Sequence, residues 1–210
     1  KKKNWKAIVT TGPTREYIDP VRYISNESSG KQGYEIAIAL NRLGIKTTLI
    51  AGPSNLVFSK DLKVKKITSA DEMLSAVKKS LPVDLAVCAA AVADFKPAEK
   101  NKSKIKKGDK KLRQINFVRN YDILEYISKN NKHRPRLVAG FSAETDKLIK
   151  NSINKIKSKH CDFIFANDIS QKDIGFNSEY NRISVIDNKG NVKVIQKNKK
   201  KFIANKIAEI

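Results

Sequence analysis

The sequence has few cysteines, few aromatic residues and no long apolar run. Its two cysteines, Cys88 and Cys161, lie in apolar stretches, where a reduced thiol packs as a small hydrophobic group. No Cys-x-x-Cys pair or cysteine–histidine cluster occurs, so we predict no metal site built from these residues and expect a reducing cytoplasm. No apolar run approaches the roughly 20 residues of a transmembrane helix, so we expect no membrane span.

Acidic residues are also scarce. Lys and Arg number 43 against 21 Asp and Glu, which gives a net charge of +22. Such a field attracts polyanions and steers anionic ligands. One interpretation is a surface coated with solvated lysines, and another is a nucleic-acid-binding module. The lysine runs lack the interleaved aromatic residues on which bases stack, so we expect no nucleic-acid partner.

The 210 residues suffice for one well-buried domain, and we interpret 1–210 as a single domain. The chain does not begin with methionine, and its basic start lacks a signal-peptide cleavage pattern. We therefore expect a piece of a longer protein in which another domain precedes this one.

Strand-like and helix-like segments alternate along the chain. Sustained alternation predicts an α/β fold, here a Rossmann-like, doubly wound, mostly parallel sheet with helices on both faces. A turn at residues 188–190 predicts an antiparallel C-terminal hairpin. The apolar spacing of Ile36 and Leu40 favours a helix, and Ser69 with Glu72 three residues later predicts a capping box. The expected strands are 6–11, 46–52, 63–69, 83–92, 112–118, 136–142, 162–168 and the hairpin 182–196; the expected helices are 31–44, 69–81, 122–130, 145–159 and 198–210.

The stretch DPVRYISNESSGKQG, at residues 19–33, is unusually polar and long for a strand-to-helix connection. Its glycines and the helix that follows resemble a phosphate-binding loop. It is not a Walker A loop, because Gly30-Lys31 is followed by Gln32. The chain also lacks Gly-x-Gly-x-x-Gly, which disfavours a dinucleotide-dependent oxidoreductase.

Several motifs together resemble one family. GPTREYIDPVRYISNESSGKQGYEIA, AGPSNL, CAAAVADFKP, KIKK, GFSAET, DFIFAND and GFNSEYNRISVI follow the order and approximate spacing found in bacterial phosphopantothenoylcysteine synthetase. The resemblance covers essentially the whole chain. Two positions depart from the family pattern: Tyr121 stands where proline is expected, and Ser142 where alanine is common.

The resemblance implies a ligase of coenzyme A biosynthesis. Members of this family join 4'-phosphopantothenate to L-cysteine with CTP and Mg²⁺ through an acyl-cytidylate, and release CMP and pyrophosphate. They are dimers, and a flavin-dependent decarboxylase domain normally precedes them. We therefore expect CTP, phosphopantothenate and cysteine as ligands, a homodimer, and an associated decarboxylase.

The same resemblance implies the site residues. Asn26, assisted by Arg22, would hold the acyl carbonyl or intermediate, and a helix beginning at Ser28, Ser29 and Gly30 would face a phosphate. Lys104 lies in a Lys-rich flap at about 95–111 that we expect to be mobile, and it would contact CTP phosphate. The other expected CTP-site residues are Cys88, Ala89, Ala90, Asp94, Asn120, Asp122, Ile123, Phe141, Lys155 and Lys159.

Composition alone would give these residues ordinary structural roles. Asn26 fits an Asx turn, Phe141 a core aromatic, and Lys155 and Lys159 a solvated helix face. The sequence identifies no general base and no protein cage for a metal, so we expect Mg²⁺ to be held mostly by triphosphate oxygens and water.

Overall fold

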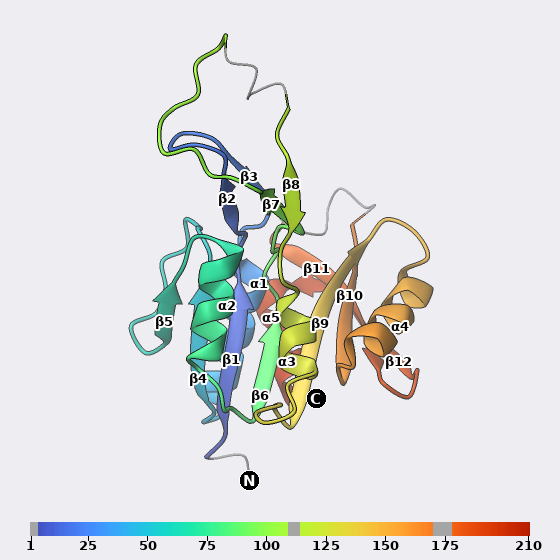
Figure 1. Cartoon of the computed structure of the whole chain (residues 1–210). Coiled ribbons are helices and arrows are strands. Elements are labelled where there is room, and N and C mark those ends of the chain that lie inside the picture. The colour runs from blue at the N-terminus through green and yellow to red at the C-terminus, as the bar shows by residue number, and fades with distance from the viewer. Residues whose placement is uncertain (1–3, 109–113, 170–177) are drawn as a thin grey trace.

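A computed structural model describes residues 4–108, 114–169 and 178–210 and is drawn in Figure 1. The helices are α1 (Lys31–Arg42), α2 (Ala70–Lys78), α3 (Ile123–Ser128), α4 (Leu148–Lys159) and α5 (Lys200–Glu209). The strands are β1 (Lys6–Thr11), β2 (Arg15–Tyr17), β3 (Tyr23–Ser25), β4 (Lys46–Ala51), β5 (Lys63–Lys66), β6 (Leu85–Cys88), β7 (Phe95–Pro97), β8 (Phe117–Arg119), β9 (Leu137–Glu144), β10 (Phe163–Asp168), β11 (Tyr180–Asp187) and β12 (Val192–Lys199).

Eight strands form the central sheet in the order β12-β11-β10-β9-β6-β1-β4-β5. The six strands β5, β4, β1, β6, β9 and β10 run parallel to one another, while β11 and β12 are antiparallel to their neighbours. The predicted fold class and the C-terminal hairpin are therefore confirmed. The chain places β4 and β5 on one side of β1 and then β6, β9 and β10 on the other side. The strand order therefore reverses beside β1. Ligands of such sheets bind at this point, beyond the carboxyl ends of the strands.

Helices cover both faces of the sheet. The apolar residues of α1 and α5, such as Ile36, Leu40 and Ile203, form one buried cluster with the sheet. Those of α2, α3 and α4, such as Met73 and Ile127, form a second cluster on the other face. Figure 1 shows α2, α3 and α4 on the near face of the sheet. Within the described chain, no helix is long and apolar enough to cross a bilayer.

Local sequence signals explain where the helices begin. The hydroxyl of Ser69 accepts a hydrogen bond from the Glu72 N–H, and the Glu72 carboxylate accepts one from the Thr68 N–H. This is the predicted capping box, except that the Glu72 carboxylate bonds the N–H of Thr68 and not that of the N-cap residue Ser69. Asp122 caps α3 in the same way, through the N–H of Glu125. The predicted helices are thus all present, with ends that differ by a few residues.

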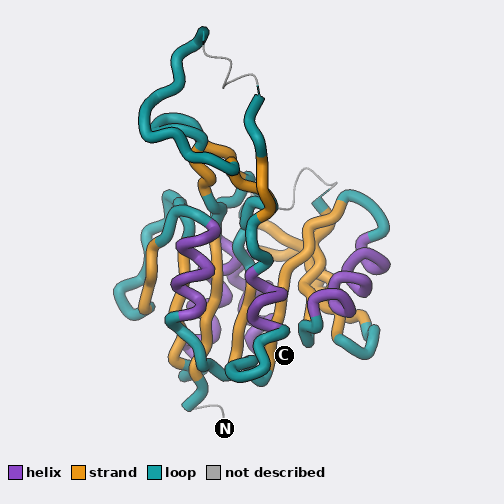
Figure 2. Tube along the Cα trace, viewed as in Figure 1, coloured by secondary structure: helices purple, strands orange, loops and turns teal. Residues whose placement is uncertain are grey.

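The strands at the ligand-binding end differ more from the prediction. The segment predicted as strand 83–92 is a regular strand only at Leu85–Cys88, although it stays beside β1, since the Ala91 N–H bonds the Gly12 carbonyl and Ala91 bridges Pro13. The predicted strand 112–118 is present only as β8, which pairs with β7 at the base of the flap; residues 109–113 lie outside the described chain. Strands β2 and β3 form a small hairpin that the polar pattern did not predict. Figure 2 shows these segments extending from one end of the sheet.

The ends of β1 and β4 approach each other closely at Gly52. A Cβ atom added there would overlap the carbonyl oxygen of Pro13, so the backbone of one segment would have to move. The Gly52 N–H also bonds the Thr11 carbonyl. A side chain at this position would therefore push apart the strand ends that carry the ligand-binding loops.

We expect Gly52→Ala to lower the free energy of unfolding by about 1–3 kcal/mol, the usual cost of overpacking. Gly108→Ala is the matched control, because a Cβ at Gly108 meets no atom of the described residues within 4 Å, and it should change stability by less than about 0.5 kcal/mol. Chemical denaturation followed by circular dichroism measures both. Equal stability of the two variants would contradict the proposed close approach.

Candidate active site

Two adjoining cavities lie beyond the carboxyl ends of β1, β6 and β9, where the strand order reverses. The first has a volume of about 550 Å³ and the second about 590 Å³. They share Ala90, Val92, Asp94, Phe141 and Lys155 in their walls. Because the loop after β6 separates them, a ligand in one cavity can meet a ligand in the other at these shared residues.

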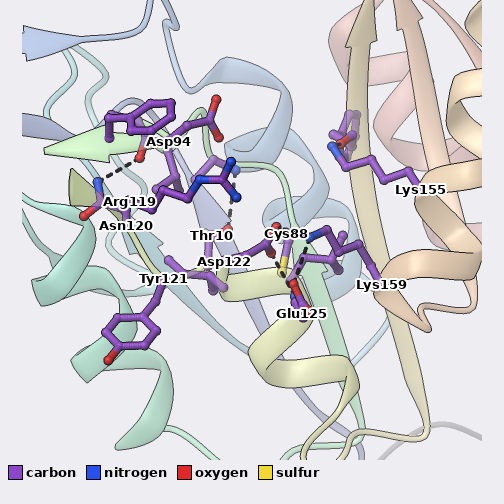
Figure 3. A pocket seen from close by; sticks show the side chains of 17 residues that line it. Thr10, Cys88, Asp94, Arg119, Asn120, Tyr121, Asp122, Glu125, Lys155 and Lys159 are labelled. Carbon is purple, nitrogen blue, oxygen red and sulfur yellow. Dashed lines mark hydrogen bonds and ion pairs between the residues drawn. The ribbon is translucent and has the colours of Figure 1, made fainter. Parts of the chain in front are cut away.

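The first cavity holds most of the predicted nucleotide residues (Figure 3). Cys88 and Ala90 come from the end of β6, and Phe141 comes from the middle of β9. The Phe141 ring also packs against Phe165, with centroids 5.2 Å apart, so it is both a core residue and a cavity wall. The remaining predicted residues in this wall are Asp94, Asn120, Asp122, Ile123, Lys155 and Lys159.

Lys155 and Lys159 lie one helical turn apart on α4 and both face the first cavity, as their spacing predicted. The Lys155 ammonium donates to the Phe141 carbonyl at 2.9 Å. The Lys159 ammonium pairs with Asp122 at 3.0 Å and with Glu125 at 2.8 Å. Two cations are thus held about one turn apart, the arrangement that a chain of phosphates requires.

Neighbouring lysines change the pKa of Glu125, a carboxylate of α3. Hydrogen bonds from Lys129 and Lys159 outweigh burial and lower the pKa of Glu125 from 4.5 to about 2. The bond to Glu125 is in turn the largest influence on Lys159, and it raises the pKa of that ammonium despite partial burial. Both groups are therefore charged at neutral pH.

The loop before α3 supplies amide and guanidinium groups. The Asn120 side chain donates to the Ala93 carbonyl at 2.8 Å, and its N–H bonds the Asp94 carbonyl. Among the described residues, the buried Oδ1 of Asn120 has no hydrogen-bond partner. It is an acceptor available to the amino group of a base. Arg119, which the sequence analysis did not single out, lies in the same wall.

Cys88 is a wall residue and not a nucleophile. Burial raises the pKa of its thiol to about 12, and the charge of Asp122 adds to this effect. The thiol therefore stays protonated at neutral pH, where only a thiolate would attack.

The second cavity contains the predicted polar loop. Ser28, Ser29 and Gly30 line it, and α1 begins at the next residue. Gly30 has φ +73°, a left-handed conformation that glycine adopts without strain. Gly30 provides no side-chain cap for α1, and the Ser29 hydroxyl accepts a 3.4 Å bond from the Lys31 N–H. Gln32 and Gly33, the next residues of the first turn, also line the cavity, so their N–H groups can meet a phosphate there.

Asn26 lines the second cavity and bonds Val92, a residue of the wall that both cavities share. Its side-chain amide donates to the Val92 carbonyl at 3.0 Å and, more weakly, to the Ala91 carbonyl at 3.4 Å. These bonds tie the opening loop to the loop after β6. Ala89, expected at the nucleotide, lines the second cavity instead of the first, and Ala90 lines both.

Arg22 and Lys104 line neither cavity in this structure. The Arg22 guanidinium pairs with Asp19 at 2.9 Å and donates to the Ile105 carbonyl. The Asp19 carboxylate in turn accepts from the Ile105 N–H at 3.2 Å. Arg22 and Asp19 therefore clamp the flap residue that follows Lys104, and the predicted contacts of Arg22 and Lys104 with substrate stay predictions.

Metal-binding groups are dispersed. No group of three or more His, Cys, Asp or Glu side chains gathers at one point in the part of the chain that the structure describes. Asp122 and Glu125 are engaged with Lys159, while Asp94 lines both cavities. Such a donor set fits a Mg²⁺ ion that is held mainly by ligand phosphates and not by a protein cage.

Comparison with known proteins identifies the family. Residues 2–210 match the model of the DNA/pantothenate metabolism flavoprotein C-terminal domain. The chain belongs to this family. The expected resemblance, which rested on the opening loop and the strand-end motifs, is therefore confirmed.

Individual relatives agree with this assignment. The chain is 39% identical over 203 residues to the coenzyme A biosynthesis bifunctional protein CoaBC of Haemophilus influenzae, covering 96% of this chain and 50% of that protein. It is also 39% identical over 210 residues to the CoaBC protein of Borreliella burgdorferi, covering 99% of this chain and 52% of that protein. The chain thus spans about half the length of these relatives.

A solved structure shares the fold. The crystal structure of the C-terminal domain of a coenzyme A biosynthesis bifunctional protein CoaBC superposes with a TM-score of 0.81 at 31% identity. The alignment covers 98% of this chain and 92% of that domain. The β7–β8 flap base and the C-terminal hairpin therefore belong to a region that aligns almost throughout.

We expect Lys159→Met to raise the pKa of Glu125 above its value of about 2. The pKa should stay below 4.5, because Lys129 still donates to Glu125. Carbon-13 NMR titration of the carboxylate measures this, and Lys157→Met, an exposed change on the same helix, should leave it unaltered. Since the pKa is depressed on folding, ionised Glu125 stabilises the wild type above pH 4.5, and this contribution is lost as the pH falls toward 2. An unaltered pKa in Lys159→Met would disprove the pairing.

We expect Asp19→Asn to loosen the flap at Ile105. Burial alone would raise the pKa of Asp19, but the N–H groups of Val21, Ile105 and Arg22 and the Arg22 charge outweigh it and lower the pKa. The charged form is therefore the one that holds Ile105. Amide hydrogen exchange at Ile105 should accelerate in Asp19→Asn and not in Glu99→Gln, an exposed change in the same flap. Unchanged protection at Ile105 would show that the clamp does not hold this residue.

Proposed function

We propose that this chain is a CTP-dependent phosphopantothenate–cysteine ligase. The observation that carries the proposal is a pair of cavities that share one wall, the first containing a lysine pair and the second containing Asn26 and a helix N-terminus. Forming an amide from a carboxylate requires an activated acyl group. A nucleotide in the first cavity and a carboxylic acid that carries a phosphate monoester in the second would bring the two reactants together at the shared wall.

The first cavity suits CTP. Lys155 and Lys159 would hold the phosphates, and the Asn120 Oδ1 would accept from the cytosine amino group. Phe141 supplies an apolar surface for the pyrimidine, and the small residues Cys88 and Ala90 leave room for it. Mg²⁺ would supply charge neutralisation of the triphosphate when bound, and Asp94 is the carboxylate that lines both cavities.

The second cavity suits 4'-phosphopantothenate. Its phosphate would meet the N–H groups at the start of α1, near Ser28, Ser29 and Gly30, and its carboxylate would reach Asn26. The Asn26 amide would donate to the acyl oxygen, where negative charge develops as the amine attacks. An uncharged amide serves this purpose at any pH near neutrality, because it does not titrate.

The flap would exclude water from the acyl-cytidylate, which is prone to hydrolysis. Lys104 lies next to the clamped Ile105, so a modest movement of the flap would carry its charge toward the phosphates. Arg22 would act through this clamp, or directly on the intermediate once the flap closes. We assign no general base, because the thiol of Cys88 stays protonated and the residues lining the cavities include no histidine.

Family context extends the proposal. Because the chain spans about half of relatives that are named bifunctional, we propose that a flavin-dependent decarboxylase domain accompanies it. We further propose a homodimer and a cytoplasmic location. The ligase product, which contains cysteine, is a direct substrate for a decarboxylase of that kind.

We expect the wild-type protein to release pyrophosphate from CTP when phosphopantothenate and Mg²⁺ are present and cysteine is absent. Mass spectrometry should detect a cytidylylated phosphopantothenate under these conditions. ATP should not replace CTP. Turnover with ATP alone would overturn the assignment of the nucleotide.

In Asn26→Asp the second half of the reaction should slow by about 10²–10³-fold, because the carboxylate cannot donate to the acyl oxygen. The cytidylylated species should then persist after cysteine is added. Asn154→Asp, an exposed change on α4, is the control and should behave like the wild type. Normal conversion in Asn26→Asp would remove Asn26 from the reaction.

A further inference from the structure

The wall of the first cavity carries no net charge, although the chain as a whole has a net charge of +22. Three cations and three carboxylates line it: Arg119, Lys155, Lys159, Asp94, Asp122 and Glu125. A lone carboxylate beside a site for phosphates would repel the ligand. The presence of three such groups in this wall therefore needs a physical reason.

Two of the carboxylates engage Lys159. Its ammonium pairs with Asp122 at 3.0 Å and donates to Glu125 at 2.8 Å, and its side chain is only 24% exposed. Figure 3 shows Lys159 reaching from α4 toward these two residues. An ammonium has three N–H groups, and no third partner of Lys159 occurs among the residues that the structure describes. One N–H is therefore available to a ligand in the cavity.

Each oxygen of the two carboxylates has its own donor. Glu125 accepts from Lys159 through Oε2 and from Lys129 through Oε1, the latter at 2.6 Å. Asp122 pairs with Lys159 through Oδ2, and its Oδ1 accepts the Glu125 N–H at 2.9 Å in the bond that caps α3. The Lys159 ammonium thus meets two acceptors whose positions are set by α3 and by Lys129.

Such contacts restrict a side chain that is flexible by nature. The four-carbon stem of lysine loses much rotamer freedom when its ammonium is held in one place. If the folded protein has already restricted the stem, a ligand that binds the ammonium does not bear that cost. Because Lys129 compensates the charge of Glu125, this carboxylate can orient Lys159 without the repulsion that an unpaired one would exert on an anion.

We propose that Glu125 is a positioning residue of the nucleotide site. Together with Asp122 it orients Lys159, so that the remaining N–H of the ammonium faces the phosphates of the nucleotide. Lys129 neutralises Glu125 in this arrangement. The identity of the ligand, a nucleoside triphosphate, rests on the function proposed above, whereas the orientation of Lys159 rests on these contacts. The sequence analysis singled out neither Glu125 nor Lys129.

A double substitution that preserves the net charge tests the orientation. Glu125→Met combined with Lys129→Met removes one carboxylate and one ammonium. We expect the KM for CTP to rise by about 3- to 10-fold, the usual cost of ordering one long side chain on binding. The kcat and the KM for phosphopantothenate should stay as in the wild type, because Lys159 would hold the phosphates equally before and during the reaction.

The control removes a similar ion pair elsewhere. Lys206 and Glu209 pair at 2.8 Å on α5, and neither lines the two cavities. Lys206→Met combined with Glu209→Met should therefore behave like the wild type. An unchanged or lowered KM for CTP in the variant lacking Glu125 and Lys129 would overturn the proposal, since the carboxylate would then not assist phosphate binding.

The effect must also pass through Lys159. In the Lys159→Met background, the same double substitution should change the KM for CTP by less than about 2-fold, because no ammonium remains to be oriented. A role confined to the stability of α3 would instead give the same rise in both backgrounds. Equal rises in the two backgrounds would therefore contradict the positioning role.

A binding measurement separates this inference from the proposed function. Inorganic triphosphate, which carries the phosphates alone, is the probe, and isothermal titration calorimetry with Mg²⁺ present measures its Kd. The wild type should bind it about 3- to 10-fold more tightly than the variant lacking Glu125 and Lys129. If this difference appears but the wild type forms no cytidylate from CTP, the proposed function fails and the positioning role stands. If CTP turnover proceeds while the two proteins show no difference in triphosphate binding, the positioning role is wrong and the function stands.

Discussion

The active-site geometry depends on one close contact between the end of β1 and the first turn of α1. The Thr11 hydroxyl donates to the Gly30 carbonyl at 2.6 Å, and a Cβ on Gly33 would overlap the Thr11 side chain. Glycine at position 33 therefore lets the helix lie directly on the strand. Gly30 supplies the left-handed turn that starts the helix there. Both cavities take their position from this contact, since it fixes the opening loop relative to the loop after β6.

The same contact determines where the lysines of the two cavities lie. Lys159 lines the first cavity, Lys200 lines the second, and Lys155 stands in the wall that both share. Ala90 and Val92, small residues of the loop after β6, belong to the same shared wall. Two anionic reactants would repel each other if they shared one basic pocket. Holding each on its own cations and letting them approach through Ala90 and Val92 lowers that repulsion and keeps the acyl group away from water.

The sequence predicted those features that depend on local pattern. Ile36 and Leu40 marked the buried face of α1, Ser69 and Glu72 marked the start of α2, and the four-residue spacing placed Lys155 and Lys159 together. It did not predict contacts that join distant segments. The Asp19 carboxylate meets Ile105 across 86 residues, and no periodicity reports such a pairing. Of the β7–β8 pair, the predicted strand 112–118 overlaps β8, whereas β7 was not predicted because its three residues begin the Lys-rich flap.

The lysines of the cavities show why composition could not locate the whole site. In a chain with a net charge of +22, a few further lysines carry no signal. Surface lysines keep their hydration and act at long range, where salt screens them. A lysine that folding has already partly desolvated loses less hydration when an anion binds and meets it at a lower dielectric. The many exposed lysines would thus raise the local concentration of anions, and the lysines that line the cavities would decide which anion stays.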